Sequence, residues 1–177
     1  MLNNKITLIG FDPAISCTGW VVLECDAEYR NERLLDYGKF IPKNIPGGRL
    51  ADIAKQIGIL CREHAPSEAI FERAGPPYRG RRIDIQTYPV YCQAVGAVES
   101  ALRLQLGDDN VYGCYPATWK KSEKKPRTVE RMNLIWGLNI KNKKSNYDMA
   151  DALGLCTWYF GMKRSRSEFP PIDKCTF

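Results

Sequence analysis

The sequence lacks the features that mark membrane proteins and repeat proteins. No apolar run approaches the roughly 18 residues that a membrane-spanning helix needs. The opening stretch MLNNKITLIGF carries one lysine, and its apolar segment is too short for a signal peptide. No internal repeat and no low-complexity tract interrupts the 177 residues. We therefore expect one globular domain over residues 1–166, with a loose tail over 167–177 and no membrane partner.

The seven cysteines also lack a pattern, because none of them forms a CxxC pair. An odd, scattered set among mostly apolar neighbours is typical of reduced thiols, and it favours neither a disulfide framework nor a zinc site. This composition predicts a reducing, cytoplasmic location.

Positive charge is present in excess, with a formal net charge of +6. It gathers in four segments, namely RGRR (79–82), KKSEKKPR (120–127), KNKK (141–144) and KRSR (163–166). A single segment of this kind is more often a solvated loop than a binding site. Four of them in one small domain, interleaved with aromatics such as Tyr78, Tyr115 and Trp119, favour a polyanionic partner, with nucleic acid as the leading candidate.

The apolar pattern predicts an α/β fold. Three short apolar segments separated by polar turns, 5–11, 19–25 and 33–41, predict an antiparallel meander. Helical spacing of Leu50, Ile53, Ala54, Ile57, Leu60 and Cys61 predicts a core-facing helix over 49–64. Further strands are expected at 68–72 and 110–115, and further helices at 84–105, 126–137 and 146–162. This order predicts a mixed five-stranded sheet, part meander and part parallel, flanked by helices.

Four acidic residues fall at the ends of these elements. Asp12 ends the first strand, and Glu72 ends the fourth. Asp148 and Asp151 lie three residues apart on the last helix, so they share one face. Three of them have a simpler explanation alone: Asp12 could start a turn before Pro13, Glu72 could be an exposed charge at a strand end, and Asp148 could be an acid in the first turn of a helix. If the first and fourth strands are parallel neighbours, however, all four carboxylates meet in one cleft.

Four carboxylates in one cleft repel each other unless a cation compensates. Mg²⁺ suits such ligands, and two such ions about 4 Å apart can activate a water and stabilise the departing oxygen in phosphodiester cleavage. A basic protein with an acidic cleft is the combination that a metal-dependent nuclease needs.

Several motifs, in this order along the chain, resemble those of the RuvC family of Holliday-junction resolvases. They are GFDP (10–13) followed by TGW (18–20), IFE (70–72), QAVGAVESAL (93–102), YPATWKK (115–121) and DMADALGL (148–155). The resemblance covers residues 5 to about 160. It implies a ribonuclease H-like fold, a homodimer, and paired symmetric nicking of a four-way DNA junction.

The resemblance also assigns roles to residues. It places the metal carboxylates at Asp12, Glu72, Asp148 and Asp151, with two Mg²⁺ ions per active site and Mn²⁺ as an alternative. It matches Lys120 to a catalytic lysine near the scissile phosphate, although Lys120 could also be one solvated charge in a basic run. A further family basic residue falls within 124–127, where we select Lys125.

Contacts to DNA are predicted in the basic segments that flank the acids. The set is Tyr78, Arg79, Arg81, Arg82, Lys121, Lys124, Lys125 and Arg127. The segment after Glu72 is longer and richer in arginine and proline than in bacterial housekeeping relatives. It is closer to viral or phage members, so no dedicated branch-migration motor is predicted, and a viral protein would act in the host cytoplasm.

The sequence thus predicts a metal-dependent, structure-selective DNA endonuclease that resolves four-way junctions. A related nuclease acting on RNA or other branched DNA, a transposase, a kinase-like ATPase and a non-catalytic junction-binding scaffold are the alternatives. A transposase would need additional DNA-binding domains, and a kinase-like ATPase would need phosphate-loop glycines that do not follow Asp12. A scaffold has no need for mutually repelling carboxylates.

Overall fold

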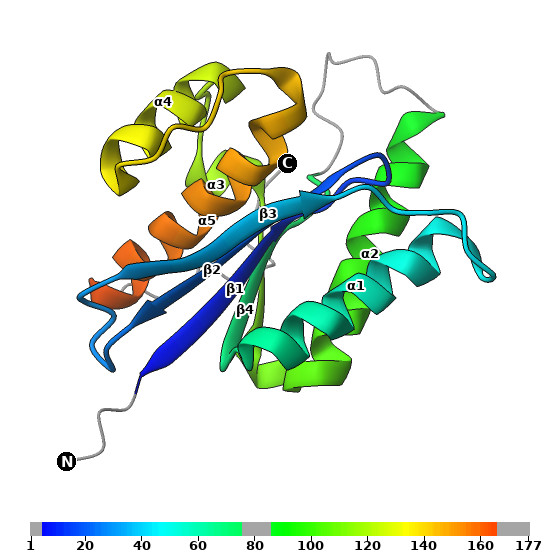
Figure 1. The fold of residues 1–177 in the computed structure, drawn as a ribbon, viewed down its shortest axis with the longest axis horizontal. Coiled ribbons are helices and arrows are strands. Elements are labelled where there is room, and N and C mark those ends of the chain that lie inside the picture. Colours follow the sequence, from blue (N-terminus) through cyan, green and yellow to red (C-terminus); the bar gives the residue numbers. More distant parts are fainter. Residues whose placement is uncertain (1–4, 76–85, 166–177) are drawn as a thin grey trace.

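The protein is built around one mixed five-stranded sheet, seen in a computed structural model that describes residues 5–75 and 86–165 (Figure 1). The strands are β1 (Ile6–Asp12), β2 (Thr18–Cys25), β3 (Arg33–Phe40), β4 (Glu68–Glu72) and β5 (Val111–Cys114). Their spatial order is β3-β2-β1-β4-β5. The first three strands form an antiparallel meander, whereas β4 is parallel to both β1 and β5. The predicted fold class is confirmed.

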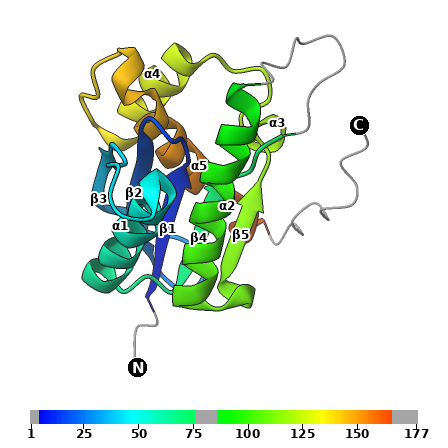
Figure 2. The ribbon, with the colours of Figure 1, turned by 90° about the vertical axis from the view of Figure 1, so that its right-hand side faces the viewer.

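Helices cover both faces of this sheet (Figures 1 and 2). On one face lie α1 (Gly48–His64) and α2 (Thr87–Leu106), which pack against each other. On the other face α5 (Tyr147–Arg164) crosses β1 and β2, and α4 (Lys125–Trp136) packs on α5. Short helical turns complete the described chain: η1 (Asp108–Asn110), α3 (Pro116–Trp119) and η2 (Lys144–Asn146). None of the described helices is long and apolar enough to cross a bilayer.

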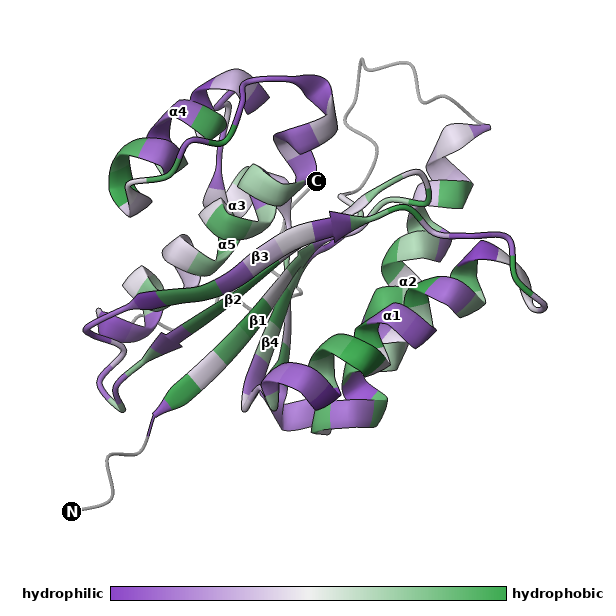
Figure 3. Ribbon diagram, in the orientation of Figure 1, coloured by the Kyte–Doolittle hydropathy of each residue, from purple (hydrophilic) through white to green (hydrophobic). Residues whose placement is uncertain are grey.

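Alternation along β1 divides the interior into two cores. Leu8 points to the core under α5, whereas Ile9 and Phe11 point to the core under α1 and α2. All three are fully buried, so this central strand is apolar on both sides. Figure 3 shows the consequence, with hydrophobic residues concentrated along β1 and β4 and more hydrophilic residues along the edge strand β3.

The predicted elements agree with the structure except in detail. The sequence pattern did not reveal α3, η1 or η2, because each spans only one turn. Ala54, predicted to face the core, is exposed. Asp52, on another side of α1, is buried instead, and its carboxylate accepts a hydrogen bond from the backbone N–H of Lys43 at 2.7 Å. The predicted tail, 167–177, lies outside the described residues.

Two glycines allow α5 to lie directly on the sheet. A Cβ at Gly10 would stand 2.1 Å from Cys156 Sγ. A Cβ at Gly19 would stand 2.2 Å from the backbone carbonyl carbon of Asp148. Gly19 is also the pairing partner of Asp12 across β1 and β2. The missing side chain at Gly19 therefore brings the first turn of α5 down beside the end of β1.

We expect Gly19→Ala to lower the free energy of unfolding by about 1–3 kcal/mol, as overpacking against an immobile backbone does. Gly161→Ala is the matched control, because Gly161 lies on α5 and a Cβ added there would meet no described atom within 4 Å outside the adjoining backbone of α5. That change should be neutral or stabilising by up to about 1 kcal/mol. Urea unfolding measures both, and equal stabilities would show that α5 adjusts without cost.

Candidate active site

The fold brings the four predicted acids to one edge of the sheet. β1 and β4 run parallel side by side, so Asp12 and Glu72 emerge at the same end. The start of α5, which packs on β1 and β2, brings Asp148 and Asp151 to the same end. Asp12, Glu72 and Asp151 are 5%, 6% and 1% exposed, while Asp148 is half-buried. The predicted juxtaposition is present.

Two lysines stand between these carboxylates. Lys125 Nζ lies 2.9 Å from Asp148 Oδ1, 3.3 Å from Asp151 Oδ2 and 3.8 Å from Asp12 Oδ2. Lys120 Nζ lies 2.8 Å from Asp151 Oδ2 and 3.9 Å from Glu72 Oε2. Lys125 comes from the first turn of α4 and Lys120 follows α3, so both arrive from the segment after β5. The two predicted lysines therefore lie at the acids, whereas Lys121, the next residue, is exposed.

Burial and crowding perturb the two strand-end acids. The pKa of Asp12 is raised well above its ordinary value, first by burial and then by the charge of Glu72, and Lys125 opposes this shift. Burial also raises the pKa of Glu72, against the lowering effect of Lys120 and of a hydrogen bond from Trp119. The carboxylates raise the pKa of Lys125 in spite of its partial burial, which holds it as a cation. The lysines thus offset only part of the acidic charge.

The acids have the chemistry of a divalent-cation site. Carboxylate oxygens are the ligands that Mg²⁺ prefers. Asp151 Oδ1 is buried and has no hydrogen-bond partner among the described residues. In the described segments, no three Asp, Glu, His or Cys side chains converge closely enough to enclose an ion. The chemistry of the donor set nevertheless fits a divalent cation.

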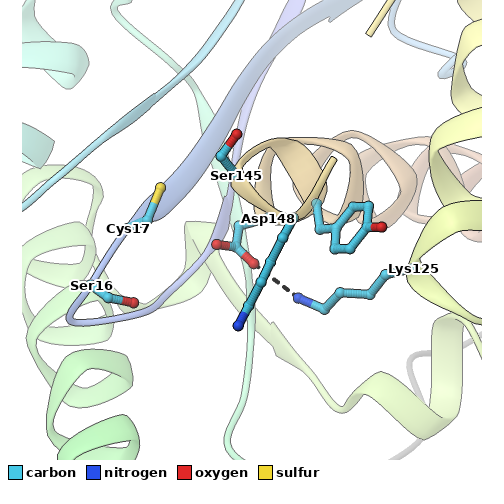
Figure 4. Close-up of a pocket in the computed structure, with 7 residues that line it drawn as sticks. Ser16, Cys17, Lys125, Ser145 and Asp148 are labelled. Carbon is cyan, nitrogen blue, oxygen red and sulfur yellow. Dashed lines mark hydrogen bonds and ion pairs between the residues drawn. The ribbon is translucent and has the colours of Figure 1, made fainter. Parts of the chain in front are cut away.

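Two hollows border this cluster of acids and lysines, one at Lys120 and the other at Asp148 and Lys125. One, of about 550 Å³, is lined by Lys120, Lys121, Ser122, Glu123, Lys124 and Arg127, and so gathers most of the predicted DNA contacts of this segment. The other, of about 780 Å³, lies between the β1–β2 loop and the start of α5 (Figure 4). In Figure 4 the Lys125 side chain extends to Asp148. Ser16 and Cys17 lie on the opposite side of this hollow. Both hollows are open beside the same cluster of charges.

The remaining predicted contacts lie outside the described residues. These are Tyr78, Arg79, Arg81 and Arg82. Their predicted role in DNA binding stays a prediction.

The sequence reasoning missed one side chain of the site. Trp119 donates a hydrogen bond from its indole Nε1 to Glu72 Oε2 at 2.9 Å, and the residue is almost fully buried. In the sequence it stood out only as an aromatic residue beside the basic segment 120–127. Its position next to Lys120 was the available signal.

Comparison with known proteins gives a partial match in sequence. No protein-family model matches the chain. The crossover junction endodeoxyribonuclease RuvC of Nitratidesulfovibrio vulgaris strain Hildenborough is 39% identical over 73 residues. The RuvC of strain DP4 is 36% identical over 70 residues. Each match covers 38% of this chain and 40% of the relative, so the similarity spans about two fifths of the length of these curated proteins.

The similarity in fold extends much further. Thermus thermophilus RuvC superposes with a TM-score of 0.66 at 19% identity, covering 92% of this chain and 98% of the other. The same protein in complex with a Holliday junction substrate gives 0.66 at 21% identity over 90% and 97%. Fowlpox virus resolvase with its Holliday junction DNA gives 0.57 at 12% identity over 88% and 97%. In sequence over its matched stretch, and in fold over nine tenths of its length, the chain is similar to the RuvC family of Holliday-junction resolvases.

Proposed function

We propose that the protein is a divalent-metal-dependent DNA endonuclease that resolves four-way junctions. The observation that carries the proposal is the cluster of Asp12, Glu72, Asp148 and Asp151 at one sheet edge, in a fold similar to RuvC. Asp12 and Glu72 are held on adjacent parallel strands, which is a rigid base for metal ligands. RuvC and fowlpox virus resolvase, both solved with Holliday junctions, support branched DNA as the substrate.

The acidic and the basic residues of the site would have different roles. The four carboxylates would hold Mg²⁺, two ions per site, with Mn²⁺ as an alternative. When bound, such ions supply an activated water and stabilise the departing oxygen. Lys120 would stabilise negative charge that develops on the phosphate, and its contacts with Glu72 and Asp151 support this role. Lys125 would compensate the acids before metal arrives, because it contacts three of them.

The basic residues that line the hollow at 120–127 would contact the phosphates of the DNA backbone. Lys121, Lys124 and Arg127 are exposed around it, so their charges are available to phosphates. Paired nicking of opposite strands needs two active sites, which a homodimer would provide. Arg79, Arg81 and Arg82, which lie outside the described residues, stay predicted contacts to DNA.

The direct test incubates the purified chain with a mobile four-way junction, a linear duplex and an RNA–DNA hybrid, with Mg²⁺ or with EDTA. We expect paired nicks in the junction only, and only with Mg²⁺. Cleavage of the hybrid alone would identify a nuclease acting on RNA. Junction binding without cleavage under any ion would identify a scaffold.

Asp12→Asn should increase the free energy of unfolding at pH 8 in the absence of divalent ions. A raised pKa means that the native state binds this proton more tightly than the unfolded state does. Ionised Asp12 therefore destabilises the fold, increasingly so as pH rises from its ordinary pKa to its raised one. The gain of the variant should vanish at acid pH. Added Mg²⁺ should raise the melting temperature of the wild type more than that of the variant.

Asp26→Asn is the control for this effect, because hydrogen bonding to the backbone of Arg30 lowers the pKa of Asp26. A lowered pKa stabilises the fold above the ordinary value, so this substitution should act in the opposite direction at pH 8. Denaturant unfolding across the pH range measures both variants. Equal or lower stability of Asp12→Asn at pH 8 would contradict the assignment of repulsion to this cluster.

Lys120→Ala should lower the single-turnover cleavage rate about tenfold or more, which corresponds to about 1.4 kcal/mol in the barrier. Its affinity for the junction should change little, because the side chain faces the acids. Lys121→Ala, with an exposed side chain, should cleave nearly normally once saturated. If both variants lose affinity equally and cleave normally at saturation, Lys120 only contacts the DNA backbone.

A further inference from the structure

We propose that Trp119 is a positioning residue that fixes the carboxylate of Glu72 for metal binding. The inference rests on the proposed metal-dependent function and concerns Trp119, a residue of the YPATWKK segment to which the RuvC resemblance assigns no role. It follows from one hydrogen bond, from the packing that holds the indole in place, and from the neighbouring lysine.

The hydrogen bond restrains the most flexible of the buried acids. A glutamate has one more rotatable bond than an aspartate, so Glu72 has more orientations to lose than Asp12 or Asp151. The indole N–H, which can only donate, points at Glu72 Oε2 from 2.9 Å. Among the described residues, no other side chain comes within hydrogen-bond distance of this carboxylate, since Lys120 Nζ remains 3.9 Å away. The bond selects one orientation and leaves Oε1 available to a ligand.

The indole itself is held by a gap in α5. Gly154 lies under the ring, where a Cβ would stand 2.8 Å from Trp119 Cζ3 and 3.4 Å from Thr128 Cγ2. Because Gly154 has no side chain, the large ring enters between α5 and α4 and is almost fully buried. A ring packed in this way directs its N–H toward the end of β4 rather than toward solvent.

The same ring also adjoins the second predicted functional group of this segment. Lys120 Nζ lies 5.1 Å from the centre of the Trp119 ring, within the range of a cation–π contact. Lys120 then reaches Asp151 at 2.8 Å. Two consecutive residues after β5 thus orient two acids that come from different elements, Glu72 from β4 and Asp151 from α5.

Removal of the indole N–H should weaken metal binding without affecting DNA binding. Loss of a hydrogen-bond partner of a metal ligand typically costs about 10–100-fold in metal affinity or activity. For Trp119→Phe we expect about tenfold weaker Mn²⁺ or Mg²⁺ binding, measured by calorimetry without DNA. Single-turnover cleavage should show a matching increase in the Mg²⁺ concentration at half-maximal rate, and high Mg²⁺ should restore part of the rate. Junction affinity in Ca²⁺ or EDTA should be unchanged.

Trp136→Phe is the matched control. Its indole Nε1 donates a hydrogen bond of 3.0 Å to Thr157 Oγ1, between α4 and α5 and away from the acids. Trp136→Phe therefore removes the same atoms and the same kind of hydrogen bond as Trp119→Phe does. It should leave metal affinity at the wild-type value. Equal metal affinities in wild type, Trp119→Phe and Trp136→Phe would overturn the proposal, as would equal losses in both variants.

A second measurement keeps the proposal falsifiable if Trp119→Phe folds poorly. In ¹⁵N-labelled wild-type protein, the indole resonance of Trp119 should shift on addition of Mg²⁺, while that of Trp136 stays in place. Glu72→Gln should shift the Trp119 resonance without metal and abolish its response to Mg²⁺. An unresponsive Trp119 resonance in a protein that binds Mg²⁺ would refute the inference alone, whereas a wild type that neither binds Mg²⁺ nor cleaves junctions would refute the proposed function itself.

Discussion

Repulsion among four carboxylates at one sheet edge is the constraint on which the rest of this structure depends. Three of them are almost completely buried, and burial raises the pKa of Asp12 and Glu72. Two lysines lower the cost of this arrangement without removing it. A fold retains such a cluster only where the surrounding elements pack well enough to hold it. The two apolar cores on either side of β1 provide that packing.

The close approach of α5 to the sheet brings Asp148 and Asp151 to the strand ends that hold Asp12 and Glu72. Gly10 and Gly19 carry no side chains where α5 crosses β1 and β2, and a third glycine, Gly154, makes room on the other side of the helix for Trp119. α5 is thus packed tightly on both sides, so Asp148 and Asp151 have little freedom relative to Asp12. The segment after β5 completes the site, because it supplies Lys120, Lys125 and the hydrogen bond to Glu72.

Much of this arrangement could be predicted because the patterns are local and strong. Alternating apolar segments indicated the strands, and the ordered motifs from GFDP to DMADALGL indicated the similarity to RuvC. The placement of Lys125 was harder, since Lys124 and Arg127 lie close beside it in the sequence, and only the first turn of α4 decides which of them turns inward. Ala54 was predicted to be buried from its helical phase alone, but it is exposed, whereas Asp52 is buried and its carboxylate binds the Lys43 backbone.

The sequence by itself determined the strand-ending positions of Asp12 and Glu72, the shared helix face of Asp148 and Asp151, and the excess of positive charge, because these depend only on residue spacing and composition. Only the tertiary structure decided which lysine contacts which acid, that the backbone of α5 lies against Gly19, and that Trp119 reaches Glu72 across 47 residues of chain. Those features depend on the packing of elements far apart in sequence. No local periodicity specifies such packing, since it is set by shape complementarity between side chains that meet only in the folded protein.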